Sequence, residues 1–162
     1  MEYKILNALT SRRTETRARW ETLLRIEGVN TPLANPDALV HLFDWTLDEV
    51  FLRFSGIESA DSALWPTQLI RGDPFACECG RNPFVAYFKA AKQALMEALV
   101  LEQSKMPRLD PIDRDLAAAE LRQVIETIGQ SEVEAFCALC VHRPEKVPGP
   151  LPRPRGFSIE ED

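Results

Sequence analysis

Apolar residues recur three and four positions apart in four stretches of the chain, which is the spacing of one face of an α-helix. In the first stretch, residues 3–27 predict an amphipathic helix that is broken near Thr10 and closed by Gly28. Its apolar positions are Ile5, Leu6, Leu9, Trp20, Leu23 and Leu24. The chain has no convincing run of alternating apolar and polar residues bounded by hairpin turns. We therefore expect an all-α protein.

The next three helices are predicted to begin in the same way. Asn35-Pro36, Asn82-Pro83 and Asp110-Pro111 each place a capping side chain directly before a proline at the first helical position. An apolar stripe follows each start: Leu39, Phe43, Leu47, Val50 and Phe54; then Phe84, Phe88, Ala91, Leu95 and Ala98; then Ala117, Leu121, Val124, Ile125 and Ile128. The residues expected in the core are Phe43, Phe51, Phe88, Leu95, Leu121, Val124 and Ile128.

Glycines mark the expected ends of two of these helices, Gly56 for the first and Gly129 for the third. Ser131 and Glu134 then match a capping box, which predicts a short helix through Cys140 or a continuation of the preceding helix through a kink at Gly129. The expected fold is an up-and-down bundle of four main helices plus a short C-terminal helix. A long loop over residues 56–82 precedes the third helix.

Length and composition are those of one soluble globular domain. The chain has 162 residues, of which 45% are hydrophobic and 27% charged, so a core can be buried without disulfides. We assign this domain to residues 1–143. The tail over residues 144–162 is rich in proline, which predicts an extended or disordered segment whose PLPRPR stretch is suited to an aromatic groove or a partner subunit.

Charge and hydropathy narrow the function classes further. A net charge of −6 argues against general nucleic-acid binding, which needs a basic footprint. Arg12, Arg13, Arg17 and Arg19 form a local basic cluster that is expected to be a solvated helix face. Neither a secretory signal nor an apolar stretch long enough to span a membrane is found. We expect a cytoplasmic protein that interacts with protein partners or with itself.

The cysteines provide the sharpest chemical hypothesis. Cys77 and Cys79 form a C-x-C pair just before one predicted helix, and Cys137 and Cys140 form a C-x-x-C pair near the end of another. If these helices pack side by side, the four thiolates can bind one tetrahedral Zn²⁺ or, alternatively, an Fe–S cluster. Such a closed site is structural rather than catalytic.

Two other interpretations of the cysteines stay open at this point. Cys77 or Cys79 can serve as a redox-sensing thiol, because the start of a helix favours a thiolate. All four can also be inert, since free cysteine is often a small buried hydrophobe. For the metal site, Arg71, Arg81 and Arg143 are near enough in sequence to offset its negative charge, and His142 is a second choice as a ligand.

Motifs for common catalytic sites are missing. Neither His41 nor His142 has a glutamate three residues before it, so the Glu-x-x-His pair of di-iron bundles is absent, and no phosphate-binding glycine loop or nucleophile elbow occurs. His41 and Asp44 could form an acid/base pair in a pocket between helices, but an exposed or core-edge histidine bonded to its neighbour is the favoured interpretation. Tryptophans are expected to anchor the core and loops rather than to form a ligand cage: Trp20, Trp45 and Trp65. A non-enzymatic role is favoured.

One family resemblance bears on this role. The segment W-x-x-L-L from Trp20, the N-P-F start at Asn82 with its long helix, and the final LRQVIETIGQSEVEAF stretch resemble the helical N-terminal sensor domains of bacterial stressosome and RsbT co-antagonist proteins. The resemblance covers roughly the first 140 residues. It implies a non-enzymatic helical input or docking module and assigns no site residues.

Overall fold

The computed structural model describes residues 3–26, 34–55, 75, 77 and 79–140, and all regular structure within them is helical. This confirms the predicted all-α class. In chain order the elements are α1 (Tyr3–Ser11), α2 (Arg13–Ile26), α3 (Pro36–Leu39), the 3₁₀ turn η2 (Val40–Leu42), α4 (Phe43–Phe54), α5 (Pro83–Ser104) and α6 (Pro111–Leu139).

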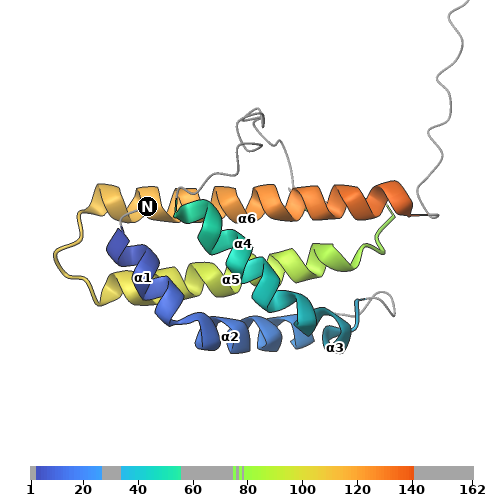
Figure 1. Ribbon diagram of the computed structural model, residues 1–162, viewed down its shortest axis with the longest axis horizontal. Helices are drawn as coiled ribbons and strands as arrows, with labels where there is room; N and C mark the ends of the chain where they lie inside the picture. Colours follow the sequence, from blue (N-terminus) through green and yellow to red (C-terminus); the bar gives the residue numbers. More distant parts are fainter. Residues whose placement is uncertain (1–2, 27–33, 56–74, 76, 78, 141–162) are drawn as a thin grey trace, which may run out of the picture.

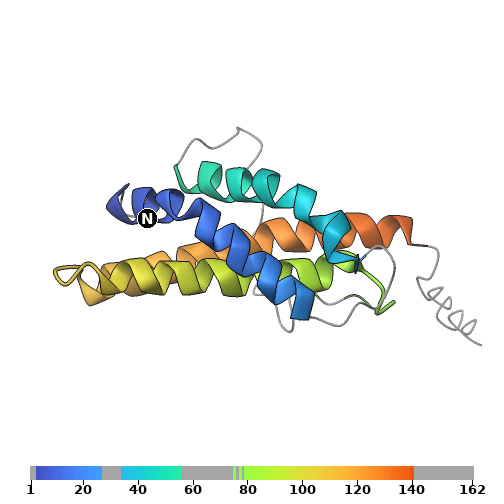
Figure 2. The same cartoon turned by 90° about the horizontal axis from the view of Figure 1, so that it is seen from below.

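Helices α5 and α6 form a long antiparallel pair, and α2 lies along the other side of α5 (Figure 1). Helix α5 is therefore central, in contact with α6, α2 and α1. Helix α4 runs obliquely across the molecule and contacts α6, α1 and α2. Seen from below, α1 and α4 lie on the same side of the α5–α6 pair (Figure 2). The predicted up-and-down bundle thus holds only loosely, because α4 is not aligned with the other main helices.

The predicted helix starts are confirmed. Asn35, Asn82 and Asp110 each accept a hydrogen bond from the backbone N–H two residues later, with proline at the first helical position. The predicted break in the first helix is present as a turn at Arg12, which separates α1 from α2. The helix expected from Pro36 onward is divided into α3, η2 and α4.

Of the two alternatives for the segment after Gly129, the continuation of the preceding helix is confirmed: α6 runs unbroken to Leu139, so Gly129 does not end it and no separate C-terminal helix forms. Glu134 accepts a hydrogen bond from the Gln130 side chain instead of closing a capping box. Gly129 is buried inside α6, and a Cβ atom built there would lie 2.5 Å from the Phe75 ring and 2.8 Å from Cγ of Phe88. The glycine permits close packing and does not end the helix.

Aromatic residues form the centre of the core. Trp20 is fully buried, its ring centroid lies 4.5 Å from that of Phe43, and its Nε1 donates to the Tyr87 carbonyl oxygen at 3.1 Å. The Tyr87 hydroxyl and Thr46 Oγ1 are 2.8 Å apart, so the buried phenol is satisfied and burial raises its pKa. These contacts join α2, α4 and α5. The predicted core is confirmed except at Val124, which is only partly buried.

The prediction that Trp45 anchors the core is wrong, because this residue of α4 is 52% exposed to solvent. Trp65, Gly28 and Gly56 lie outside the described residues, as does the tail over residues 144–162. Among the described helices, none has the length and apolar character needed to cross a membrane.

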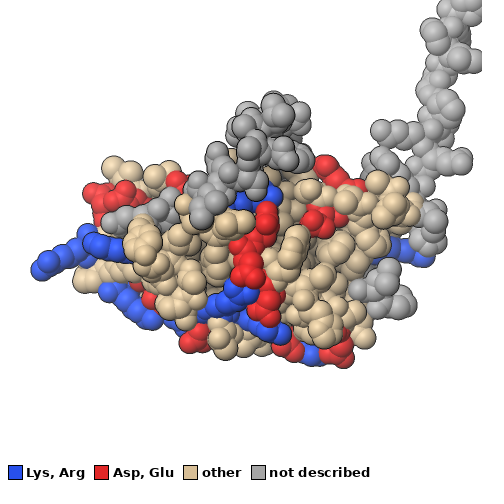
Figure 3. Space-filling model, viewed as in Figure 1, with Lys and Arg blue, Asp and Glu red and all other residues tan. Residues whose placement is uncertain are grey.

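The basic cluster is paired rather than simply solvated. Arg13 and Arg17 on α2 form ion pairs with Asp44 on α4, and Arg13 also pairs with Asp48. Figure 3 shows acidic and basic side chains next to one another in a band across this face of the molecule. Arg12, in the turn before α2, pairs with Glu102 of α5 at 2.9 Å, and Arg19 of α2 pairs with Glu97 of α5 at 2.6 Å. The arginines of the cluster are partly exposed, as expected for a solvated face, and their ion pairs also connect α2 to both α4 and α5.

The close packing at Gly129 generates the first prediction. Gly129→Ala should lower the free energy of unfolding by about 1–2 kcal/mol, because contacts this short place the overpacking cost at about 2–3 kcal/mol, against a gain of about 1 kcal/mol in helix propensity. Gln123→Ala, at an exposed position of the same helix, is the control and should change stability by less than about 0.5 kcal/mol. Denaturant unfolding measures both variants. A Gly129→Ala variant as stable as the original would show that the two phenylalanines do not pack against this position.

Candidate metal centre

The segment that carries the first cysteine pair is held at both ends. Phe75 is buried against Phe88, with ring centroids 6.0 Å apart. Between Phe75 and the start of α5, the Gly80 N–H donates to the Cys77 carbonyl oxygen at 3.1 Å, and Gly80 has a φ of 62°. Glycine adopts this left-handed conformation without steric cost. The resulting turn directs both Cys77 and Cys79 toward the end of α6.

Asn82 fixes the other end and is 1% exposed. Its Oδ1 accepts from the Phe84 N–H at 3.0 Å as the N-cap of α5. Its Nδ2 donates to the Val133 carbonyl oxygen at 2.9 Å and approaches Cys137 Sγ at 3.5 Å. One side chain therefore caps α5, binds the backbone of α6 and reaches the cysteines.

The structure brings the cysteine pairs together across sixty residues of sequence. Cys77 Sγ lies 2.8 Å from Cys137 Sγ and 3.0 Å from Cys79 Sγ. The Cys140 thiol also interacts with Cys79. Cys137 projects from the last turn of α6, and Cys140 is its extended C-cap residue. All four thiols are free and partly exposed.

The two thiols of the C-x-C pair differ in acidity. Burial raises the pKa of Cys77, and the hydrogen bonds with Cys137 and Cys79 act in the same direction. The pKa of Cys79 is lowered, first by its hydrogen bond with Cys77 and then by the Arg81 N–H, which donates to Cys79 Sγ at 3.4 Å. Backbone N–H groups that point at sulfur stabilise a thiolate, as a metal ligand requires.

The sulfurs do not stand at coordination distances from one another. Four thiolates bound at about 2.3 Å to a tetrahedral ion are separated by about 3.8 Å, whereas the two measured separations here are 2.8 and 3.0 Å. Accordingly, no group of three or more His, Cys, Asp or Glu within the described residues has an arrangement that could hold a metal ion. Binding an ion would require these sulfurs to move apart by roughly 1 Å, which is a side-chain rotation rather than a change of fold.

The remaining predicted groups are placed as follows. Arg81 directly follows the Gly80 turn, while Arg71, His142 and Arg143 lie outside the described residues. His41 is exposed, and the partners of Asp44 are Arg13 and Arg17. The geometry therefore gives no support to an acid/base pair of His41 and Asp44.

Sequence reasoning missed two residues of this centre. Phe75 was part of the long loop with no assigned role, and Asn82 was recognised only as a helix cap. An aromatic residue two positions before a C-x-C pair is a weak signal. The donor function of Asn82 leaves no trace in the sequence, since Asp or Ser would cap the helix equally well.

Comparisons with known proteins give no relative: no family model matches the chain, and neither the curated proteins nor the solved structures contain a significant match. The function must therefore be argued from the centre itself.

Asn82 generates the second prediction. Asn82→Ala should lower the free energy of unfolding by about 1.5–2.5 kcal/mol, because it removes a helix cap worth about 1 kcal/mol and the buried hydrogen bond to the Val133 carbonyl oxygen, worth about 0.5–1.5 kcal/mol. Asp110→Ala removes the matching cap of α6 at an exposed position and should cost only about 1 kcal/mol. Chemical denaturation gives both values. Equal losses for the two variants would show that the bond to α6 contributes nothing beyond the cap.

Proposed function

We propose that Cys77, Cys79, Cys137 and Cys140 hold one structural Zn²⁺ in a non-enzymatic cytoplasmic module for regulation or protein interaction. The observation that carries the proposal is the approach of Cys77 Sγ to Cys137 Sγ at 2.8 Å, which joins the two pairs. Four soft thiolates from two rigidly placed segments are the ligand set typical of structural zinc.

The surroundings of the thiols support the binding of an anionic metal–thiolate group. Four thiolates on Zn²⁺ carry a net charge of −2, and Cys77 and Cys79 directly precede the positive end of the 22-residue helix α5. The Arg81 N–H already donates to Cys79 Sγ, and the Asn82 amide approaches Cys137 Sγ. These donors would persist around a bound ion and orient its ligands.

The regulatory role rests on the chemistry of the ligand set. A site closed by four thiolates leaves no position for a substrate, so its effect is to fix one conformation of residues 75–82 against α6. Free thiols of this kind persist in a reducing compartment, and the four cysteines are unpaired here. The predicted resemblance to sensor domains agrees with such a module, although the centre does not depend on it.

Metal content is the first test. The full chain purified without chelators should contain about one Zn per chain, and its removal should lower Tm, because ligation energy contributes to folding. Iron with visible absorbance would identify the Fe–S alternative instead. Metal-free protein with four titratable thiols, even after purification with added zinc, would contradict the proposal.

Serine variants test whether the two pairs share one ion. Cys79→Ser and Cys140→Ser should each reduce the bound zinc and lower Tm by similar amounts, since each removes one of four ligands. Leu139→Ser is the matched control, because Leu139 is the immediate neighbour of Cys140 and is 84% exposed. It should retain about one Zn per chain. Zinc loss in only one of the two cysteine variants would contradict a shared site.

The contact between Cys77 and Cys137 also favours a second candidate, a thiol-based redox sensor. Oxidation by hydrogen peroxide would join these two sulfurs, with both thiol protons and two electrons passing to the peroxide to give two molecules of water. Mass spectrometry distinguishes the candidates, with fragmentation of the linked tryptic peptides to assign the pairing, since Cys77 and Cys79 share one peptide and Cys137 and Cys140 another. A Cys77–Cys137 disulfide in metal-free protein supports the sensor, whereas four alkylatable thiols released only after zinc removal support the structural site.

A further inference from the structure

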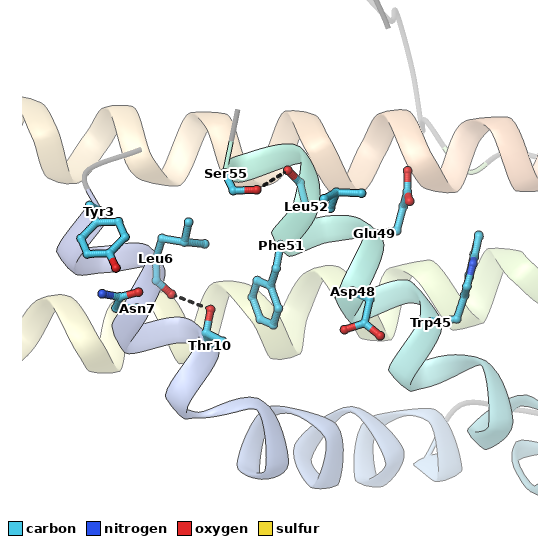
Figure 4. Close-up of a pocket in the computed structure, with 10 residues that line it drawn as sticks. All are labelled: Tyr3, Leu6, Asn7, Thr10, Trp45, Asp48, Glu49, Phe51, Leu52 and Ser55. Carbon is cyan, nitrogen blue, oxygen red and sulfur yellow. Dashed lines mark hydrogen bonds between the residues drawn. The ribbon is translucent and has the colours of Figure 1, made fainter. Parts of the chain in front are cut away.

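A groove of about 530 Å³ lies between α1 and α4. Figure 4 shows its walls, with Tyr3 and Leu6 on α1 facing Phe51 and Leu52 on α4 and with Trp45 at one end. Several of its apolar side chains are accessible: Tyr3 is 74% exposed, Trp45 52% and Leu52 41%. Exposed aromatic residues that gather along one groove are typical of an interaction site.

Acidic side chains accompany the aromatic ones. Asp48 and Glu49 line the groove, and their cation partners are Arg13 and Arg53. Trp45 also lines a neighbouring hollow of about 310 Å³, together with Phe84, Tyr87 and Glu132. Within the part of the chain that the structure describes, Glu132 forms no ion pair. We call the two hollows together the Trp45 groove.

The chain itself contains a segment whose chemistry matches this surface. Residues 150–155 read PLPRPR, which alternates proline with leucine or arginine. Proline-rich segments adopt the polyproline II conformation and bind aromatic grooves at low entropic cost, with arginines beside acidic residues. Arg153 and Arg155 supply the positive charge that Glu132 would attract, whereas Asp48 and Glu49 already pair with Arg13 and Arg53.

The length of the chain allows this contact within one molecule. Glu132 lies eight residues before Cys140 on α6, a distance of about 12 Å along the helix. The 13 residues from Cys140 to Arg153 span up to about 40 Å in the polyproline II conformation. We propose that residues 150–155 bind in the Trp45 groove of their own chain, with prolines against Trp45 and an arginine beside Glu132. This contact requires no metal at the cysteines.

Photo-crosslinking in the full chain tests the proposal. A benzophenone amino acid in place of Phe157, just beyond PLPRPR, should crosslink to peptides that contain residues 42–55 or 132. At low protein concentration the product should be monomeric and its yield independent of concentration. Crosslinks to other surfaces, a dimeric product or no crosslink at all would each overturn docking within the chain.

Charge-reversal variants test its specificity. Arg153→Glu combined with Arg155→Glu should lower the crosslink yield by about fivefold or more, because the expected ion pairs become repulsive. Arg143→Glu combined with Lys146→Glu makes the same change of charge outside the segment and should leave the yield unchanged. Trp45→Ala should also lower the crosslink yield. Because Trp45 is exposed, this variant should keep its fold, which circular dichroism checks. Equal yields in all variants would contradict recognition of PLPRPR.

Discussion

The start of α5 is bound to the last turns of α6 by one buried side chain, Asn82, and the candidate centre depends on this connection. An unpaired buried amide would cost about 1–3 kcal/mol, so the position is stable only because both ends of the side chain are satisfied. Its oxygen caps α5 and its nitrogen donates to the Val133 carbonyl oxygen. The same contacts bring the Cys77–Cys79 turn next to Cys137.

Apolar packing, rather than the ion pairs, holds the helices in place around this junction. The side chains that pair between α2 and α4 are 31–67% exposed, and such pairs contribute about 0–1 kcal/mol each. Burial of Trp20 against Phe43 and Tyr87 removes far more apolar surface from water. The arginines of α2 therefore select its orientation, while the aromatic core provides most of the stability that keeps α5 and α6 aligned.

Much of the fold could be predicted from local rules. Each Asn-Pro or Asp-Pro start encodes its own cap, and the apolar stripes identify the buried faces, so the starts of α3, α5 and α6 and nearly all of the expected core are confirmed. Gly129 misled because a glycine that ends a helix and one that admits two aromatic rings look alike in sequence. The oblique path of α4 depends on long-range packing and has no local signal.

The candidate centre was predictable in part. The spacing of both cysteine pairs indicated that they suit chelation, and the structure brings the two pairs together. The hydrogen bond from Asn82 to α6 and the packing of Phe75 on Phe88 could not be predicted, because they depend on contacts between distant residues.

Whether an ion occupies the centre stays a prediction. X-ray absorption at the zinc edge of the full chain tests it most directly. The expected result is a first shell of four sulfur ligands at about 2.3 Å. A first shell that contains nitrogen or oxygen, or fewer than four sulfurs, would contradict a single centre built from all four cysteines.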